Sequence, residues 1–210
     1  PVVSGNVSFY NETQNKSISP TPTIGGVGLI RNLDKMMSSN LKESGSYLYV
    51  VGKTTGHLHQ SEFFREVINM NEGPSPEINL FNEKNNGLSV QQLINNKLVN
   101  SVHDVSSGGI ILALSEMCIS GKIGAKIKVH ENKISPHEYL FGEDQSRYII
   151  EINEKNKNKV SNILKKNSIY FEIIGKTQKD NLDIDKYLNI SIEELSKLNS
   201  FWFKNYFLEN

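Results

Sequence analysis

Three short clusters of residues have side chains suited to binding phosphate and metal rather than to packing. They are Ser4-Gly5-Asn6-Val7-Ser8, His103-Asp104-Val105-Ser106-Ser107-Gly108-Gly109 and Gly142-Glu143-Asp144-Gln145-Ser146-Arg147. In the first cluster, the glycine amide can approach a nucleotide, the asparagine oxygen is a hard ligand compatible with magnesium, and a serine hydroxyl can donate to a substrate. Each cluster alone is a weak motif, because short polar motifs also arise by chance.

The second cluster lies at a predicted strand-to-helix turn. Gly108 and Gly109 would let the backbone come close to a ligand. The helix that follows has an apolar face at spacings of three and four residues, made of Ile110, Ala113, Leu114 and Met117. Burial of that face would fix a helix N-terminus whose N–H groups and partial positive charge suit a phosphate or carboxylate. The alternative is that Asp104, Ser106 or Ser107 simply caps the helix and the two glycines simply turn the chain.

The third cluster also has two interpretations. Glu143, Asp144 and Arg147 could form a solvated loop with a surface ion pair, which would contribute little to stability. They could instead face a phosphate or a nucleotide together with the neighbouring turn.

The histidines do not predict a metal site. They are scattered along the chain, at His57, His59, His103, His130 and His137. His103, at a strand end, is expected to be satisfied by backbone groups, although it could orient Asp104. No arrangement typical of a zinc site or of a Ser-His-Asp or Cys-His catalytic centre is present in the sequence.

Composition excludes several classes of partner. The 210 residues suffice for one domain of ordinary size, with a fragment of another attached, and 23 Lys and Arg balance 23 Asp and Glu. We therefore expect neither nucleic acid nor an anionic membrane as a partner. No window is apolar enough to span a bilayer, and no secretory leader is evident, so a cytoplasmic location is expected. The single cysteine, Cys118, is expected to be a small core residue.

The N-terminal residues predict a strand followed by a connection. Residues 1–12 alternate apolar and small polar groups, with a glycine that interrupts the alternation. Residues 13–19 are polar and predict a loop. Ser19-Pro20-Thr21-Pro22-Thr23 predicts an extended path, because each proline fixes its own φ and disfavours helix before it.

From about residue 32 the pattern is that of an α/β fold with a mixed sheet and packed helices. Strands are expected at 46–53, 125–129, 148–152 and 170–176, and helices at 61–68, 76–97, 155–166 and 191–207. Ser75 is expected to cap the 76–97 helix, with Pro76 in its first turn. That helix is expected to bury Ile78, Leu80, Phe81, Leu88, Leu93 and Ile94. The closing helix is expected to pack Trp202 and Phe203 on the body.

Four ordered motifs give the chain a specific resemblance. They are Pro1-Val-Val-Ser-Gly-Asn-Val-Ser-Phe-Tyr-Asn-Glu12, Pro20-Thr-Pro-Thr-Ile-Gly-Gly-Val-Gly-Leu-Ile30, His103-Asp-Val-Ser-Ser-Gly-Gly109 and Leu140-Phe-Gly-Glu-Asp-Gln-Ser-Arg-Tyr148. Together they resemble the C-terminal part of the phosphoribosylformylglycinamidine synthase family, ATP-dependent enzymes of purine synthesis that belong to the aminoimidazole ribonucleotide (AIR) synthetase-related superfamily. The resemblance implies that residues 1–20 are the last strand of an N-terminal-type domain, 21–31 a linker, and 32–210 a C-terminal-type domain.

By this resemblance, the first cluster contributes to an active site. Gly5 would contact ATP, Asn6 would bind Mg²⁺, and Ser8 would contact formylglycinamide ribonucleotide. The implied partners are the remainder of the polypeptide, a glutaminase subunit that supplies ammonia and a small PurS-type subunit. Catalytic residues would lie elsewhere in the polypeptide, so the 210 residues are expected to be inactive alone.

The other two clusters rank below the first. By pseudo-symmetry with loops of the family's first half, a second set of residues would face phosphate or nucleotide at an auxiliary site. This set is Asp104, Ser106, Gly108, Gly109, Glu143, Asp144 and Gln145. Two departures weaken the likeness: Ser107 stands where aspartate is common, and His59-Gln60 replaces Gly-Gly. The alternative function is a non-catalytic structural, dimerisation or auxiliary nucleotide-binding domain of the same superfamily.

Overall fold

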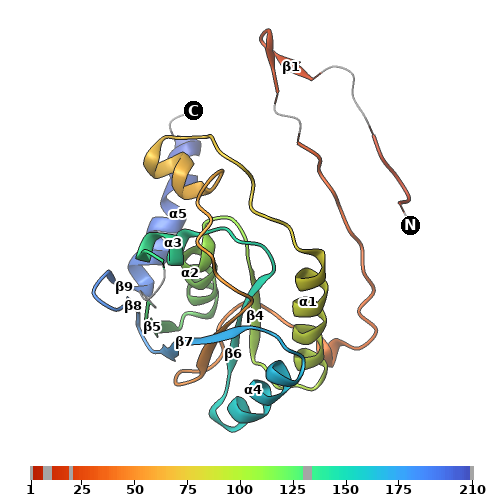
Figure 1. The fold of residues 1–210 in the computed structure, drawn as a ribbon. Helices are drawn as coiled ribbons and strands as arrows, with labels where there is room; N and C mark the ends of the chain where they lie inside the picture. Colours follow the sequence, from red (N-terminus) through yellow and green to blue (C-terminus); the bar gives the residue numbers. More distant parts are fainter. Residues whose placement is uncertain (1, 7–10, 19–20, 130–133, 209–210) are drawn as a thin grey trace. The chain divides into compact units, whose positions relative to one another are not determined.

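The computed structural model describes residues 2–6, 11–18, 21–129 and 134–208, and the chain divides into two compact units, Pro1–Leu33 and Asp34–Asn210. The regular part of the first unit is a hairpin of strands β1 (Glu12–Thr13) and β2 (Lys16–Ser17), which precedes the short 3-10 helix η1 (Leu33–Lys35) (Figure 1). Gln14 and Asn15 turn the hairpin with φ of 52° and 60°. Two consecutive positive φ values are typical of a two-residue type I′ hairpin turn.

The expectations for residues 1–19 were wrong where the structure describes them. Residues 2–6 have no regular secondary structure, and the polar stretch expected to be a loop contains the hairpin. Asparagine tolerates the left-handed conformation that Asn15 adopts in the turn, so a polar segment can form a hairpin here. Residues 7–10 lie outside the described residues.

The second unit is built on a seven-stranded sheet, which confirms the predicted mixed α/β fold (Figure 1). Its spatial order is β4-β6-β3-β7-β5-β8-β9. The strands are β3 (Tyr47–Val51), β4 (Ser101–Val105), β5 (Gly124–Ile127), β6 (Arg147–Ile152), β7 (Phe171–Gln178), β8 (Asn181–Ile184) and β9 (Leu188–Ser191). β5 and β8 pair in parallel, whereas the other neighbours pair antiparallel.

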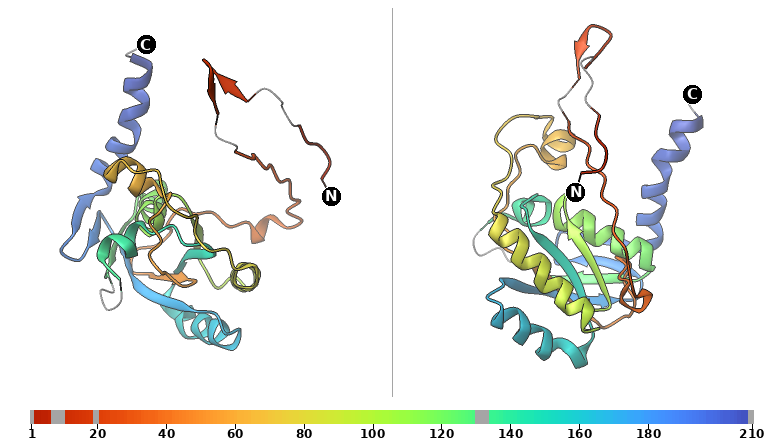
Figure 2. Two further views of the ribbon diagram at one scale, coloured as in Figure 1. Left: turned by 45° about the horizontal axis from the view of Figure 1, so that its top comes forward. Right: turned by 90° about the vertical axis from the view of Figure 1, so that its right-hand side faces the viewer.

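Helices cover both faces of this sheet (Figures 1 and 2). They are α1 (Leu80–Asn95), α2 (Gly109–Gly121), α3 (Pro136–Phe141), α4 (Lys157–Lys166) and α5 (Ile192–Leu208), with the π-helix η2 (Phe64–Ile68) and the 3-10 helix η3 (Glu154–Asn156). Leu48 and Val50 of β3 point to the core under α2 and α3, whereas Tyr49 and Val51 point to the core under α1 and α4. This alternation follows from the period of two in a strand.

The predicted apolar face of α2 is confirmed. Ile110, Leu114 and Met117 of α2 are fully buried, as are Val160 and Leu164 of α4. Cys118 is buried as expected, and burial raises the pKa of its thiol to about 12. A thiol with that pKa stays protonated at neutral pH and serves as a small apolar side chain.

The predicted start of α1 was wrong. The helix begins four residues beyond Pro76, and Asn79, not Ser75, caps it by accepting a 3.0 Å hydrogen bond from the amide of Asn82. Leu93 is buried as expected, but four of the apolar residues assigned to the core are exposed: Ile78, Leu80, Phe81 and Leu88. The face of α1 that packs on the sheet instead carries Asn86, Ser89, Val90 and Leu93.

The predicted packing of α5 was also wrong. Ile192 is buried, but Trp202 and Phe203 are 63% and 56% exposed. No helix that the structure describes is long and apolar enough to cross a bilayer.

Candidate functional site

The two polar clusters of the second unit meet in the structure. Glu143 Oε1 accepts hydrogen bonds from the amide of Gly108 at 2.7 Å and from the amide of Glu62 at 2.8 Å. Gly108 is the N-cap residue of α2, and no side chain caps this helix from within its own turn. A carboxylate of the chain itself therefore lies where a helix N-terminus favours an anion. The expectation that Asp104, Ser106 or Ser107 caps α2 was wrong.

The two glycines of the turn are required by this close approach. Gly108 and Gly109 have φ of 77° and 71°, a region that favours glycine. A Cβ atom on Gly109 would lie 2.6 Å from the carbonyl oxygen of Leu140 and 2.8 Å from that of Gly142. The Gly-Gly turn thus brings α2 against the 140–142 backbone of the third cluster rather than against open space.

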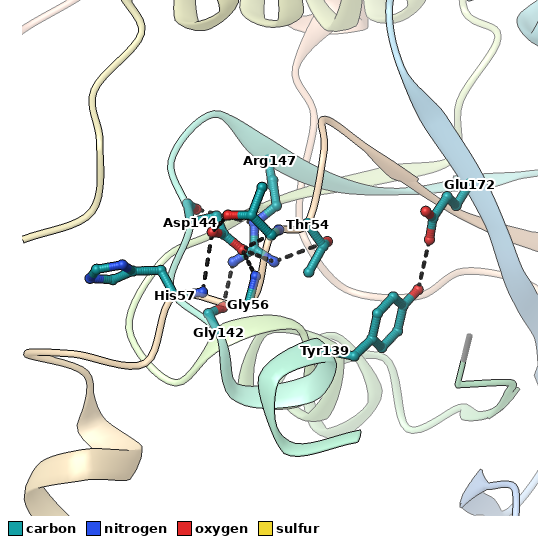
Figure 3. A network of polar contacts seen from close by, with 9 residues as sticks. Thr54, Gly56, His57, Tyr139, Gly142, Asp144, Arg147 and Glu172 are labelled. Atoms are coloured by element: carbon teal, nitrogen blue, oxygen red, sulfur yellow. Dashed lines mark hydrogen bonds and ion pairs between the residues drawn. The ribbon is translucent and has the colours of Figure 1, made fainter. Parts of the chain in front are cut away.

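Asp144 holds a second turn of the backbone (Figure 3). Its carboxylate accepts hydrogen bonds from the amides of Thr55 at 3.0 Å, Gly56 at 2.9 Å and His57 at 3.3 Å, and from the Thr55 hydroxyl. Burial alone would raise the pKa of Asp144, but the hydrogen bonds from Thr55 and Gly56 and the charge of Arg147 outweigh it, and the pKa lies below its ordinary value. Asp144 is therefore ionised and fully engaged at neutral pH.

Arg147 is buried, so the expectation of a surface ion pair was wrong. Its side chain is 0% exposed, and its guanidinium donates to the carbonyl oxygens of Asp144 at 3.1 Å and Gly142 at 2.5 Å and to the Thr54 hydroxyl at 3.3 Å (Figure 3). Burial lowers the pKa of Arg147, opposed by the charge of Asp144 3.8 Å away. A buried charge of this kind persists because it is paired and hydrogen-bonded.

A polar cavity of about 350 Å³ adjoins this network. It is lined by Lys53, Thr55, His57, Pro76, Glu77, Asn79, Asn82, Asn86, Asp144, Gln145 and Ser146. Asn86, on the buried face of α1, donates to the carbonyl and hydroxyl oxygens of Ser146, both at 2.9 Å. Gln145 is exposed, and so it is the member of the Glu143-Asp144-Gln145 run that solvent reaches most easily.

The remaining predicted residues of the second cluster lie at the surface. Asp104 and Ser106 are exposed. Nδ1 of His103 lies 2.7 Å from the backbone oxygen of Asp104, and Nε2 lies 2.8 Å from Glu116 Oε2. The expectation that backbone groups satisfy His103 therefore holds for Nδ1, whereas a carboxylate is the partner of Nε2.

In the first cluster, Gly5 and Asn6 are exposed, and apart from its chain neighbours no residue in the described part of the chain has an atom within 4 Å of a Cβ built on Gly5. Ser8 lies outside the described residues. No group of three or more His, Cys, Asp or Glu residues in the described part of the chain could hold a metal ion. Asn6 offers one hard oxygen ligand of the type that Mg²⁺ prefers.

Sequence reasoning missed a buried carboxylate on the central sheet. Glu151 is fully buried in β6 and accepts hydrogen bonds from the amides of Lys42 at 2.9 Å and Glu43 at 3.0 Å and from the Ser101 hydroxyl at 2.9 Å. It ties the segment that leads into β3 to the sheet. Its position in Tyr148-Ile149-Ile150-Glu151-Ile152, where the neighbouring residues are apolar, was the available signal, because a charge in such a run must be paired.

A match to a known protein family identifies the family of this fold. The C-terminal domain of AIR synthase related protein matches residues 43–185. The chain belongs to this family. The matched range covers the sheet from β3 to β8, both clusters of the second unit and the cavity between α1 and the 144–146 loop.

Curated relatives of this AIR synthase related chain are similar over its whole length. Phosphoribosylformylglycinamidine synthase subunit PurL of Pelagibacter ubique is 53% identical over 210 residues, which are 100% of this chain and 29% of that protein. PurL of Bartonella henselae is 38% identical over 206 residues, which are 98% of this chain and 28% of that protein. The chain thus spans less than a third of these relatives and corresponds to a C-terminal portion of them.

Solved structures share the fold. T. maritima PurL complexed with FGAR has a TM-score of 0.67 at 17% identity, covering 78% of this chain and 30% of that one. PurLQS from Thermotoga maritima has a TM-score of 0.63 at 18% identity, covering 78% and 28%. T. maritima PurL complexed with ATP has a TM-score of 0.60 at 17% identity, covering 78% and 28%.

Proposed function

We propose that the chain is the C-terminal part of a PurL-type phosphoribosylformylglycinamidine synthase of purine biosynthesis. The observation that carries the proposal is the 53% identity to Pelagibacter ubique PurL, which extends over all 210 residues and includes both units. The reaction would convert formylglycinamide ribonucleotide, ATP and glutamine-derived ammonia to the amidine, ADP and phosphate. This is the chemistry of a carbon–nitrogen ligase with glutamine as amide donor.

In this proposal the first cluster forms one wall of the ATP site. Gly5 would approach the nucleotide, Asn6 would provide a ligand to Mg²⁺, and Ser8 would contact formylglycinamide ribonucleotide. The exposure of Gly5 and Asn6 supports these roles, because neither residue is committed to packing. Bound Mg²⁺ would offset phosphate charge while the amide oxygen is activated by ATP. The domain limits proposed for this arrangement are 1–20, 21–31 and 32–210, and the division between Leu33 and Asp34 supports a boundary near residue 32.

The second unit would play a supporting role. Oε1 of Glu143 and both carboxylate oxygens of Asp144 already accept hydrogen bonds from backbone amides of the same unit, which leaves these two carboxylates little capacity to hold a metal–nucleotide complex. Of the auxiliary set, Gln145 still lines an open cavity, and Asp104 and Ser106 remain at the surface. These observations favour the structural alternative over an auxiliary nucleotide site for residues 32–210.

The proposed partners follow from the proposed reaction. A T. maritima complex named PurLQS shares the fold, which supports association with a glutaminase subunit and a small PurS-type subunit. A cytoplasmic location accompanies this role in nucleotide synthesis.

Reconstitution from two pieces tests the proposal. The 210-residue chain and the upstream part of the PurL-type polypeptide would be purified separately and mixed with the glutaminase and PurS-type subunits. We expect ATP- and glutamine-dependent amidine formation only when both pieces are present. Activity of the upstream part alone at the rate of the mixture would contradict the proposal. A mixture without activity would also contradict it if the intact polypeptide with the same subunits were active.

A further inference from the structure

The C-terminal half of α5 carries an apolar surface that the rest of the second unit does not cover. The surface consists of Leu198, Phe201, Trp202, Phe203 and Phe207, here called the α5 aromatic face. Each of these side chains is 56–64% exposed, whereas Ile192 in the first turn is 8% exposed. Both views of Figure 2 show the C-terminal half of α5 extending away from the sheet and its helices.

The base of α5 is fixed to the body, so this face is held on a rigid element. Ile192 is part of the core beneath α2, Leu195 packs against that core, and the amide of Ile192 donates to the carbonyl oxygen of Asp180 at 2.9 Å. Beyond this base the aromatic rings contact one another. The ring centroids of Trp202 and Phe203 are 5.8 Å apart, and those of Phe203 and Phe207 are 4.7 Å apart.

The size of the face is that of an interaction site. With about 200 Å² for a fully exposed aromatic side chain, the five side chains present roughly 500 Å² of apolar surface. The largest apolar patch on a typical monomer is about 300–600 Å² and is often a functional surface. Its charges do not favour a lipid surface, because residues 192–208 contain two glutamates and two lysines, Glu193, Glu194, Lys197 and Lys204. Helices that lie on membranes are typically rich in lysine and arginine.

We propose that the α5 aromatic face docks onto the upstream part of the same PurL-type polypeptide. The inference rests on the proposed function. The chain is matched over its whole length, including α5, by a relative of which it spans 29%, so more than two thirds of such a polypeptide lies outside this structure. A second apolar group of the same unit is exposed as well: Ile78, Leu80 and Phe81. These residues lie at the start of α1, which packs on the opposite face of the sheet from α5, so two copies of this chain paired along α5 would leave them exposed. The rest of a PurL-type polypeptide, more than twice the size of this chain, is large enough to contact both faces.

Hydroxyl-radical footprinting read by mass spectrometry tests the occupant directly. Trp202 and Phe203 would be labelled in the 210-residue chain and in the complete PurL-type polypeptide. We expect labelling of the peptide that contains them to fall at least fivefold in the complete polypeptide. Equal labelling in the two proteins would overturn the proposal. Strong protection in the 210-residue chain alone, with a dimer in sedimentation velocity, would assign the face to a second copy and also overturn it. So would protection that appears only with phosphatidylcholine and phosphatidylglycerol vesicles.

A matched pair of substitutions separates docking from helix stability. Trp202→Glu places a charge on the α5 aromatic face, whereas Lys197→Gln changes an exposed residue on the charged side of α5, where Lys197 pairs with Glu193 of the same helix. In the 210-residue chain both variants should melt within about 2 °C of the parent. In the complete polypeptide only Trp202→Glu should lower the melting temperature, by several degrees. Equal effects of the two substitutions there would contradict docking, and because neither readout is activity, the outcome does not depend on the proposed reaction.

Discussion

The 142–147 loop and the 2–6 segment contain similar polar residues, but they use them in opposite ways. In the loop, Asp144 and Arg147 are buried, and both side chains form hydrogen bonds within the same unit. In the segment, Gly5 and Asn6 are exposed, and no atom of another described residue lies within 4 Å of a Cβ built on Gly5, its chain neighbours aside. The polar side chains of the loop therefore stabilise the fold, whereas Gly5 and Asn6 of the segment remain accessible to a ligand.

The difference shows why residue type alone does not identify a binding site. A helix N-terminus and a glycine turn favour an anion, but that anion can be a carboxylate of the same chain. Glu143 is such an anion at α2. Whether a polar motif binds a ligand depends on whether its donors and acceptors are already satisfied inside the protein.

Replacing Asp144 should have the largest effect on stability. Asp144→Asn removes a buried charge that accepts from three amides and a hydroxyl and leaves Arg147 without its carboxylate. We expect a loss of about 3 kcal/mol in the free energy of unfolding of the 210-residue chain. Urea denaturation measures it. Asp104→Asn, at an exposed position of the second cluster, is the control and should change stability by less than about 0.5 kcal/mol. Equal effects of the two substitutions would contradict the contrast.

Lowering the pH should remove the contribution of the Asp144 carboxylate to the free energy of unfolding. Because the pKa of Asp144 is lowered in the folded protein, its stabilisation is complete above the unfolded pKa of about 4 and is lost as the pH falls through the folded pKa. The difference in unfolding free energy between the parent and Asp144→Asn should therefore be constant from about pH 7 to pH 5 and shrink below about pH 4. A difference that does not depend on pH down to about pH 2 would show that the charge of Asp144 is not responsible.

Replacing Glu143 should have a smaller effect. Glu143→Gln keeps an oxygen that can accept from Gly108 and Glu62 but removes the negative charge at the α2 N-terminus. We expect a loss of about 1 kcal/mol in the free energy of unfolding, and a loss that decreases at high salt concentration. Gln145→Ala, at the neighbouring exposed position, is the control and should be close to neutral. If Glu143→Gln left the free energy of unfolding unchanged, the carboxylate would not stabilise the helix through its charge.

Much of the fold could be predicted from the sequence, because periodic apolar patterns report burial. Such patterns predicted the buried face of α2 and the strand β3. The α1 start was missed because Asn and Ser are about equally good N-cap residues, so sequence preference did not separate Ser75 from Asn79. Trp202 and Phe203 were assigned to the core because an apolar face predicts burial but does not say against which surface.

The site was predicted less completely. Sequence placed Glu143, Asp144 and the two glycines of the turn in separate motifs, and only the three-dimensional structure shows that Glu143 closes onto Gly108. Contacts between residues 35 positions apart depend on sheet order, which single-residue preferences do not encode. The role of Asn6 rests on resemblance, because the described part of the chain contains no group of three or more His, Cys, Asp or Glu residues that could hold a metal ion.

The Mg²⁺ dependence of Asn6→Ala in the complete PurL-type polypeptide tests the central claim most directly. The rate of ATP- and glutamine-dependent amidine formation would be measured against Mg²⁺ concentration, alongside unfolding of the same variant in the 210-residue chain. We expect the half-saturating Mg²⁺ concentration to rise at least about tenfold, while the unfolding free energy of the chain stays within about 0.3 kcal/mol of the parent. An unchanged rate with an unchanged Mg²⁺ requirement would contradict the assignment of residues 2–6 to the ATP site.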